Sequence, residues 1–91
     1  MTSSLWDMRA GETACLVAYD ERLDIRYRTR LRELGFHPGA RVVCVRTPRF
    51  GAPHVYRVGT SIFSLEDSLA RHVLVEVSDR VANTTLSAPA A

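Results

Sequence analysis

The sequence predicts a mostly β domain, a small closed or nearly closed barrel of about five strands with one inserted α-helix and a short helical turn. Short apolar segments alternate with Gly- and Pro-containing turns, and only one segment has a helical period. The chain has 91 residues, which is room for one domain with one modest core. Closing such strands into a barrel removes exposed sheet edges.

The first elements are a turn and a buried strand. Residues 5–8 (LWDM) can form a single turn that lays apolar side chains on the core before Gly11 redirects the chain. Residues 12–19 (ETACLVAY) form a short, mostly apolar segment between turn residues, which is typical of a strand. Cys15 in this strand and Cys44 in a later one are predicted to be small core residues.

The next segment, residues 22–34, fits two periods. Alternation of apolar residues with arginines suits a half-exposed strand. A helix instead aligns four apolar side chains on one stripe, namely Leu23, Tyr27, Leu31 and Leu34. Leu34 fits only the helix, and Gly35 directly after it is a helix stop signal. We therefore expect a helix.

Turn residues punctuate the rest of the chain. After Pro38-Gly39, strands are expected at residues 40–47, 54–58 and 60–65, with a hairpin loop at 48–53 and a tight turn at Gly59. A helical turn follows at 66–71, with Ser64 as its expected N-cap, and a closing strand at 72–77. The domain is thus expected to span 1–77, and residues 78–91, which lack periodicity, to form a flexible tail.

Composition excludes several classes of function. The twelve basic residues are all Arg, but ten acidic residues balance them to a net charge of +2, so strong nucleic-acid binding is not implied. No signal peptide or membrane-length apolar run is present, and the cysteines form no disulfide framework, so a cytoplasmic location is expected. The three histidines and two cysteines are too scattered to predict a metal site or a tightly bound cofactor. No nucleophile-and-base pair or phosphate-binding loop indicates an enzyme.

Three segments resemble the FeoA family, the small accessory proteins of bacterial ferrous-iron uptake. They are residues 30–39 (RLRELGFHPG), 46–53 (RTPRFGAP), and Ser64-Leu65-Glu66 leading through Ala70 to Val73-Leu74-Val75. The resemblance covers about residues 5–77. The sequence departs from the family pattern at Glu66, where an Arg is frequent, and at Ala52, where an Asp is common.

The resemblance implies an SH3-like β-barrel without catalytic activity that works with FeoB, the membrane Fe(II) transporter with a cytosolic GTP-binding domain. Fe(II) would be the cargo of that partner and not a resident cofactor. The fold-signature residues are most simply explained as backbone turns and core contacts: Gly35, Pro38, Gly39, Gly51, Pro53 and Leu65. Similar domains end metal-dependent repressors, which leaves a stand-alone regulatory SH3-like domain as an alternative.

A partner surface is expected on the helix and the hairpin. The candidates are Arg26, Arg30, Leu31, Leu34 and Phe50. A solvated helix face, with its arginines paired to Asp24 and Glu33, is the competing interpretation. A nucleic-acid-binding barrel is the other alternative, with Tyr19, Tyr27, Tyr56 and Phe63 as its stacking residues. Homo-oligomerisation stays open.

Overall fold

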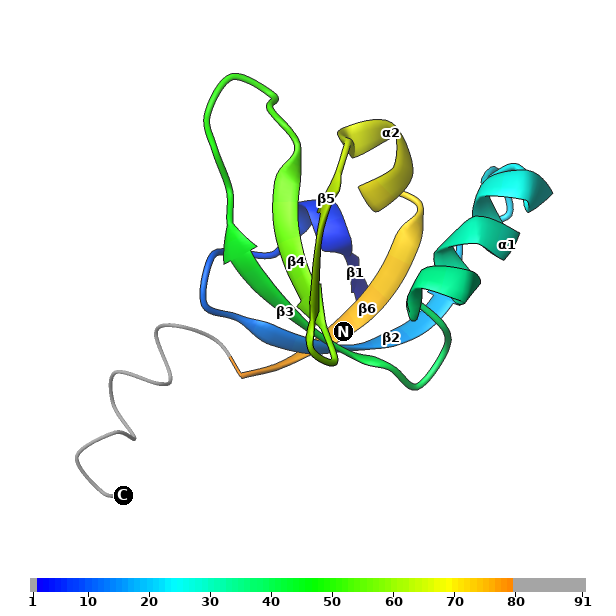
Figure 1. The fold of residues 1–91 in the computed structure, drawn as a ribbon, viewed down its shortest axis with the longest axis horizontal. Coiled ribbons are helices and arrows are strands. Elements are labelled where there is room, and N and C mark those ends of the chain that lie inside the picture. Colours follow the sequence, from blue (N-terminus) through cyan, green and yellow to red (C-terminus); the bar gives the residue numbers. More distant parts are fainter. Residues whose placement is uncertain (1, 80–91) are drawn as a thin grey trace.

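The computed structural model describes residues 2–79, which form a curled antiparallel sheet with a helix on its flank (Figure 1). The strands follow the order β1-β6-β2-β3-β4-β5 in the sheet. They are β1 (Thr2–Ser4), β2 (Thr13–Tyr19), β3 (Arg41–Arg46), β4 (His54–Val58), β5 (Ser61–Leu65) and β6 (Val73–Asp79). The helical elements are η1 (Leu5–Asp7, a 3-10 turn), α1 (Ile25–Leu34) and α2 (Asp67–Ala70). The predicted mostly β barrel with one inserted helix and a short helical turn is confirmed.

The barrel differs from the prediction at its two ends. A sixth strand, β1, pairs with β6 through registers such as Ser3 opposite Val75. Its three polar residues carry no apolar alternation, so no pattern in the sequence indicated it. Among residues 2–79 no pairing joins β1 to β5, so the barrel stays open.

The last strand is longer than expected. It runs to Asp79, which lies opposite Thr13 of β2, and so extends two residues beyond the expected end at 77. Residues 80–91 of the expected tail lie outside the described residues. None of the helices in the described part of the chain has the length and apolar character needed to cross a membrane.

One apolar core fills the interior of the curled sheet. Its largest fully buried side chains come from β2, β3, β4, β6, η1 and the segment after α1: Tyr56, Phe36, Leu5, Leu16, Val42, Val73, Val75 and Cys44. Burial raises the pKa of the Cys44 thiol to about 11, so this cysteine is an inert core residue, as predicted. Cys15 was predicted to be buried too, and this is wrong. It is exposed because its neighbours Ala14 and Leu16 take the inward positions of β2.

The N-terminal segment is part of the core. Leu5 is fully buried, and its carbonyl accepts a hydrogen bond of 2.8 Å from the hydroxyl of Tyr56 on β4. Trp6 stacks on His54, also on β4, with ring centroids 3.6 Å apart and planes 4° apart. These contacts join the start of the chain to a hairpin about fifty residues later.

Three details of the helices differ from the prediction. Helix α1 begins at Ile25 and not at residue 22, because the Asp24 carboxylate caps it by accepting a hydrogen bond from the Arg26 N–H at 2.8 Å. Ser64 was expected to cap the helical turn, but it lies within β5. The N-cap of α2 is Glu66, whose side chain makes no capping bond.

The fold-signature residues serve the turns and the core. Gly35 ends α1 with φ +109, and a Cβ there would lie 3.1 Å from Cγ1 of Val58, so both backbone and packing require glycine. Gly39 and Gly51 also have positive φ, and Leu65 is buried. Pro38 and Pro53 are exposed next to these turns.

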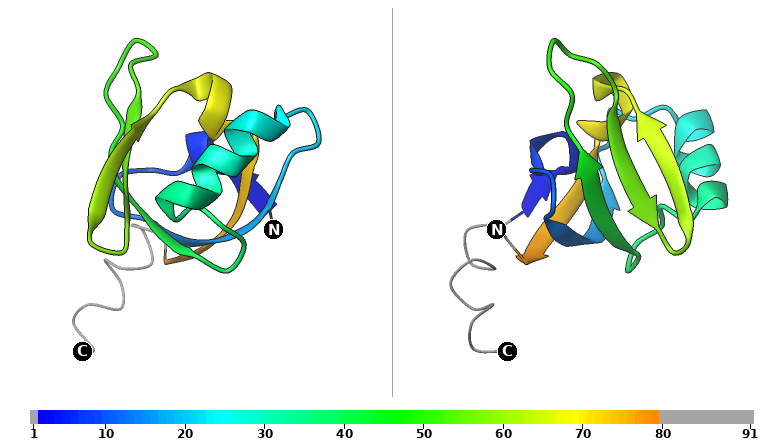
Figure 2. Two further views of the ribbon diagram at one scale, coloured as in Figure 1. Left: turned by 45° about the vertical axis from the view of Figure 1, so that its right-hand side comes forward. Right: turned by 60° about the vertical axis from the view of Figure 1, so that its left-hand side comes forward.

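The loop between β3 and β4, residues 47–53, projects beyond the rest of the barrel. It rises past α2 in Figure 1 and extends from the barrel in both views of Figure 2. Phe50, near its tip, is fully exposed and has φ +64, an unusual backbone conformation for a residue other than glycine.

Candidate partner-binding surface

Helix α1 lies against the open side of the barrel and presents one face to solvent (Figure 1). Leu31 is the buried residue of the helix, with an exposed fraction of 2 %, and Leu34 packs partly buried against the same core. Leu23, just before the helix, is also buried. The prediction that Leu31 and Leu34 contact a partner is therefore not supported by their positions, because the barrel already occupies the face that they line.

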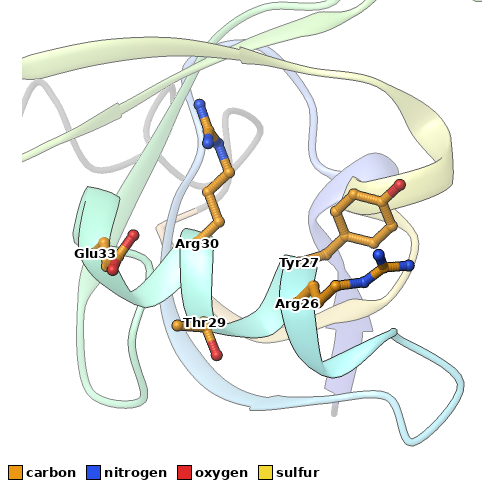
Figure 3. Close-up of a pocket in the computed structure, with 5 residues that line it drawn as sticks. All are labelled: Arg26, Tyr27, Thr29, Arg30 and Glu33. Atoms are coloured by element: carbon orange, nitrogen blue, oxygen red, sulfur yellow. The ribbon is translucent and has the colours of Figure 1, made fainter.

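A shallow hollow of about 380 Å³ lies along the solvent-exposed part of α1. Five residues line it: Arg26, Tyr27, Thr29, Arg30 and Glu33. Figure 3 shows the side chains of Tyr27 and Arg30 extending from the helix toward the segment that contains β5 and α2. Of the five residues expected to bind a partner, Arg26 and Arg30 thus share one surface.

Two large apolar side chains add to the exposed surface of this region. Ile25 and Tyr27, in the first turn of α1, have exposed fractions of 67 % and 50 %. The segment after α1 contacts the β4–β5 hairpin, because Phe36 packs against Phe63 edge to face with ring centroids 5.6 Å apart. The surface combines aromatic and Arg side chains, the residue types that dominate binding energy in interfaces.

The arginines of the exposed flank are only partly neutralised. Arg26 pairs with Asp24 at 3.3 Å, and the Arg26 backbone N–H, followed by its side chain, lowers the pKa of the Asp24 carboxyl. Arg22 pairs with Asp20 at 3.8 Å. Arg30 makes no ion pair with any of residues 2–79. The expected pairing with Asp24 is confirmed for Arg26, and Arg30 is left to supply positive charge to the hollow.

The other arginine flank of α1 faces the barrel. The Arg28 guanidinium donates a 3.2 Å hydrogen bond to the Leu23 carbonyl and lies 5.9 Å from the centre of the Tyr19 ring. Tyr19 in turn donates a hydrogen bond to the Phe36 carbonyl, and burial raises the pKa of its hydroxyl against the lowering effect of Arg32. Arg28 therefore holds the helix onto β2 and is not available to a partner.

Phe50 lies apart from the helix surface. It sits on the β3–β4 loop, and α1 lies on the far side of the molecule from that loop in Figure 1. The predicted candidates therefore form no single surface: two line the hollow on α1, two contact the core, and one lies on the hairpin loop.

Sequence reasoning missed three of the residues that line the hollow. Tyr27 was placed on the buried stripe and, in the nucleic-acid alternative, among the stacking residues. Glu33 was considered only as an ion-pair partner of the arginines, and Thr29 was not considered. The capping Asp24 was the available signal, because it places Tyr27 in the first turn of the helix. Figure 1 shows that this end of α1 lies farthest from the sheet.

The structure does not gather a stacking platform for nucleic acid. Of the four expected stacking residues, Tyr56 is fully buried, Tyr19 and Phe63 are partly buried against the core, and only Tyr27 is exposed. Within residues 2–79 no three potential ligands from His, Cys, Asp and Glu side chains come together.

Comparisons with known proteins agree on the fold. The FeoA domain model matches residues 4–77. The zinc-complexed FeoA of Stenotrophomonas maltophilia, described as a prokaryotic SH3-domain protein and a candidate activating factor of ferrous iron transport, is 32 % identical. The similarity covers 80 % of this chain and 88 % of that one, with a TM-score of 0.70. A search of curated proteins found no match.

Two further structures share the fold alone. An FeoA-like protein from Clostridium acetobutylicum has 19 % identity and a TM-score of 0.75, over 87 % of this chain and 90 % of that one. A manganese-dependent transcriptional repressor in complex with manganese has 15 % identity and a TM-score of 0.77, over 85 % of this chain and 37 % of that one. The predicted SH3-like barrel is confirmed, and the chain belongs to the FeoA domain family, which is linked to ferrous iron transport.

Proposed function

We propose that this protein is a non-catalytic accessory module that binds the cytosolic part of an FeoB-type Fe(II) transporter and modulates its assembly or GTP-linked gating. Membership of the FeoA domain family is the observation that carries the proposal. Fe(II) is then the cargo of the transporter, and no cofactor is assigned to this chain. The site of action would be the cytoplasmic face of the membrane.

The hollow on α1 is the docking surface that we assign to the transporter. Tyr27 offers an exposed aromatic ring, and Arg30 offers a guanidinium free of ion pairs within residues 2–79. A planar guanidinium binds carboxylates in a bidentate manner, so the complementary surface is an acidic segment. The exposed Ile25 would extend the apolar part of the contact.

The experiment is capture of the soluble GTP-binding domain, and of the full-length transporter of the same organism, with and without a GTP analogue. We expect specific capture that changes with nucleotide state. Tyr27→Ala and the double variant Arg26→Gln/Arg30→Gln should each weaken capture by about tenfold or more, as for interface residues of these types.

The matched control is Arg49→Gln, which removes an arginine from the hairpin loop on the other side of the molecule. It should leave capture of the soluble domain unchanged. Equal capture by the α1 variants would show that the docking surface lies elsewhere. Absence of capture in every nucleotide state would reject the transporter as partner.

A further inference from the structure

The β3–β4 hairpin and the strand after it carry charge of one sign. Residues 41–65 contain four arginines and no Asp or Glu, although the whole chain has ten acidic residues. The four are Arg41, Arg46, Arg49 and Arg57, and all are exposed. The acidic residues lie outside this segment, so the hairpin and β5 form a second arginine-rich region besides α1, and one without acidic residues of its own.

An exposed aromatic residue lies among the arginines of the hairpin. Phe50 has its whole side chain in solvent, directly after Arg49 and four residues after Arg46. Neither arginine forms an ion pair with any of residues 2–79. The loop and the end of β3 therefore supply one aromatic ring and two guanidinium groups, neither of which has an ion-pair partner among residues 2–79.

The shape of this site favours one kind of ligand. The loop is convex and projects beyond the barrel (Figure 2). A protein partner would need a pocket shaped to this ring, whereas a fluid lipid surface admits an aromatic side chain at the boundary of headgroups and acyl chains. Arginines beside the ring reach the phosphates of anionic lipids while their apolar stems stay in contact with the interface.

We propose that the β3–β4 hairpin binds an anionic phospholipid surface through Phe50 and Arg49 of its loop and Arg46 at the end of β3. A contact formed by one ring and two arginines is weak and reversible. Its effect is to raise the concentration of the protein at the membrane, which strengthens any second contact made there. The lipid contact does not depend on the transporter proposed above.

Vesicle flotation with the purified full-length chain tests this proposal without any transporter. The chain should float with vesicles that contain phosphatidylglycerol and not with vesicles of phosphatidylcholine alone, and added salt should weaken the binding. Arg46→Gln/Arg49→Gln should lower the partition coefficient by roughly fivefold for each arginine. Phe50→Ala should lower it by roughly tenfold.

The matched control, Arg26→Gln/Arg30→Gln, removes the same charge from the α1 surface and should leave vesicle binding unchanged. Phe50→Trp gives an independent readout: its fluorescence, after subtraction of the parent signal from Trp6, should shift to the blue and be quenched by brominated lipid only in anionic vesicles. Circular dichroism checks that each variant is folded.

Three results would overturn the proposal. The first is no flotation with anionic vesicles, and the second is an equal loss of flotation in the α1 and hairpin variants, which would indicate a response to net charge alone. The third is a loss of capture of the soluble GTP-binding domain by Phe50→Ala without any change in vesicle binding, which would place the ring in a protein pocket. The first two results leave the capture experiment on the α1 surface unaffected.

Discussion

The arginines of helix α1 have different roles, and the position of each arginine on the helix determines its role. Arg28 and Arg30 are two positions apart on α1. Arg28 turns inward to the Leu23 carbonyl and the Tyr19 ring, whereas Arg30 lines the exposed hollow. Successive positions on a helix point about 100° apart, so an arginine-rich helix presents some of these side chains to the sheet and others to solvent.

Two substitutions on α1 distinguish a core residue from a surface residue. Leu31→Ala should lower the free energy of unfolding by about 2–5 kcal/mol, because it leaves a cavity under α1. Tyr27→Ala, on the exposed side of the same helix, should change it by about 0.5 kcal/mol or less. Urea unfolding monitored by circular dichroism measures both. A small effect of Leu31→Ala would mean that α1 is not anchored through this residue.

At the scale of elements, the position of α1 depends on both of its ends. Asp24 fixes the start by its cap, and Gly35 permits the sharp turn that brings Phe36 into the core directly after the helix. The Phe36 N–H donates to the Leu31 carbonyl at 2.9 Å, which closes the last turn. The two caps fix where α1 begins and ends. They therefore determine the directions of the Tyr27 and Arg30 side chains, which line the hollow.

The C-terminal cap gives a testable difference between two glycines. Gly35→Ala should destabilise the fold by about 1–3 kcal/mol through its backbone alone, and further through the contact with Val58. Gly59→Ala is the control, since Gly59 has φ +61, within the left-handed region open to other residues, and a Cβ there meets no atom within 4 Å. Its cost should be about 1 kcal/mol. Thermal unfolding of the two variants compares them, and equal losses would contradict the role of the Val58 contact.

At the scale of the whole molecule, the N-terminal segment completes the barrel. The segment adds β1 to the edge of β6 and covers the core with Leu5, while Trp6 stacks on His54. Arg71, just after α2, lies 5.7 Å from the centre of the Trp6 ring. Segments from the start, middle and end of the described chain therefore meet around one indole ring.

The burial of His54 beneath Trp6 predicts that the stability of the fold depends on pH. Burial lowers the pKa of His54 below its ordinary value of 6.5, and its Nδ1 lies 3.5 Å from the Tyr56 hydroxyl. As pH falls below the unfolded-state pKa, the unfolded chain binds a proton that the folded chain resists, so stability present above about pH 6.5 is lost. Unfolding measured from about pH 7 to about pH 5 should show this loss.

His54→Phe keeps a ring to stack on Trp6 and should remove the pH dependence in this window. The Arg22 backbone N–H is the main cause that lowers the pKa of Asp20. Asp20 therefore titrates at a lower pH than His54, and the two effects on stability can be distinguished. An unchanged slope in His54→Phe would assign the effect to another group.

Patterns of neighbouring residues predicted most of the secondary structure of this protein. Short apolar segments between turn residues indicated β2 to β6, Leu34 and the stop at Gly35 favoured a helix over residues 22–34, and the motif around Phe36 and the hairpin indicated the FeoA family. These features depend on neighbours in the chain, so they can be recognised without coordinates.

The residues available to a partner could not be predicted in this way, because long-range packing selects them. Whether Leu31 or Tyr27 faces solvent depends on where the barrel ends beneath α1, and the separation of Arg30 from Phe50 depends on the curl of the sheet. Strand β1 was invisible for the same reason, since its polar residues are held by backbone hydrogen bonds to a strand about seventy positions later. Long-range packing sets these outcomes, and a pattern of period two or 3.6 carries no information about it.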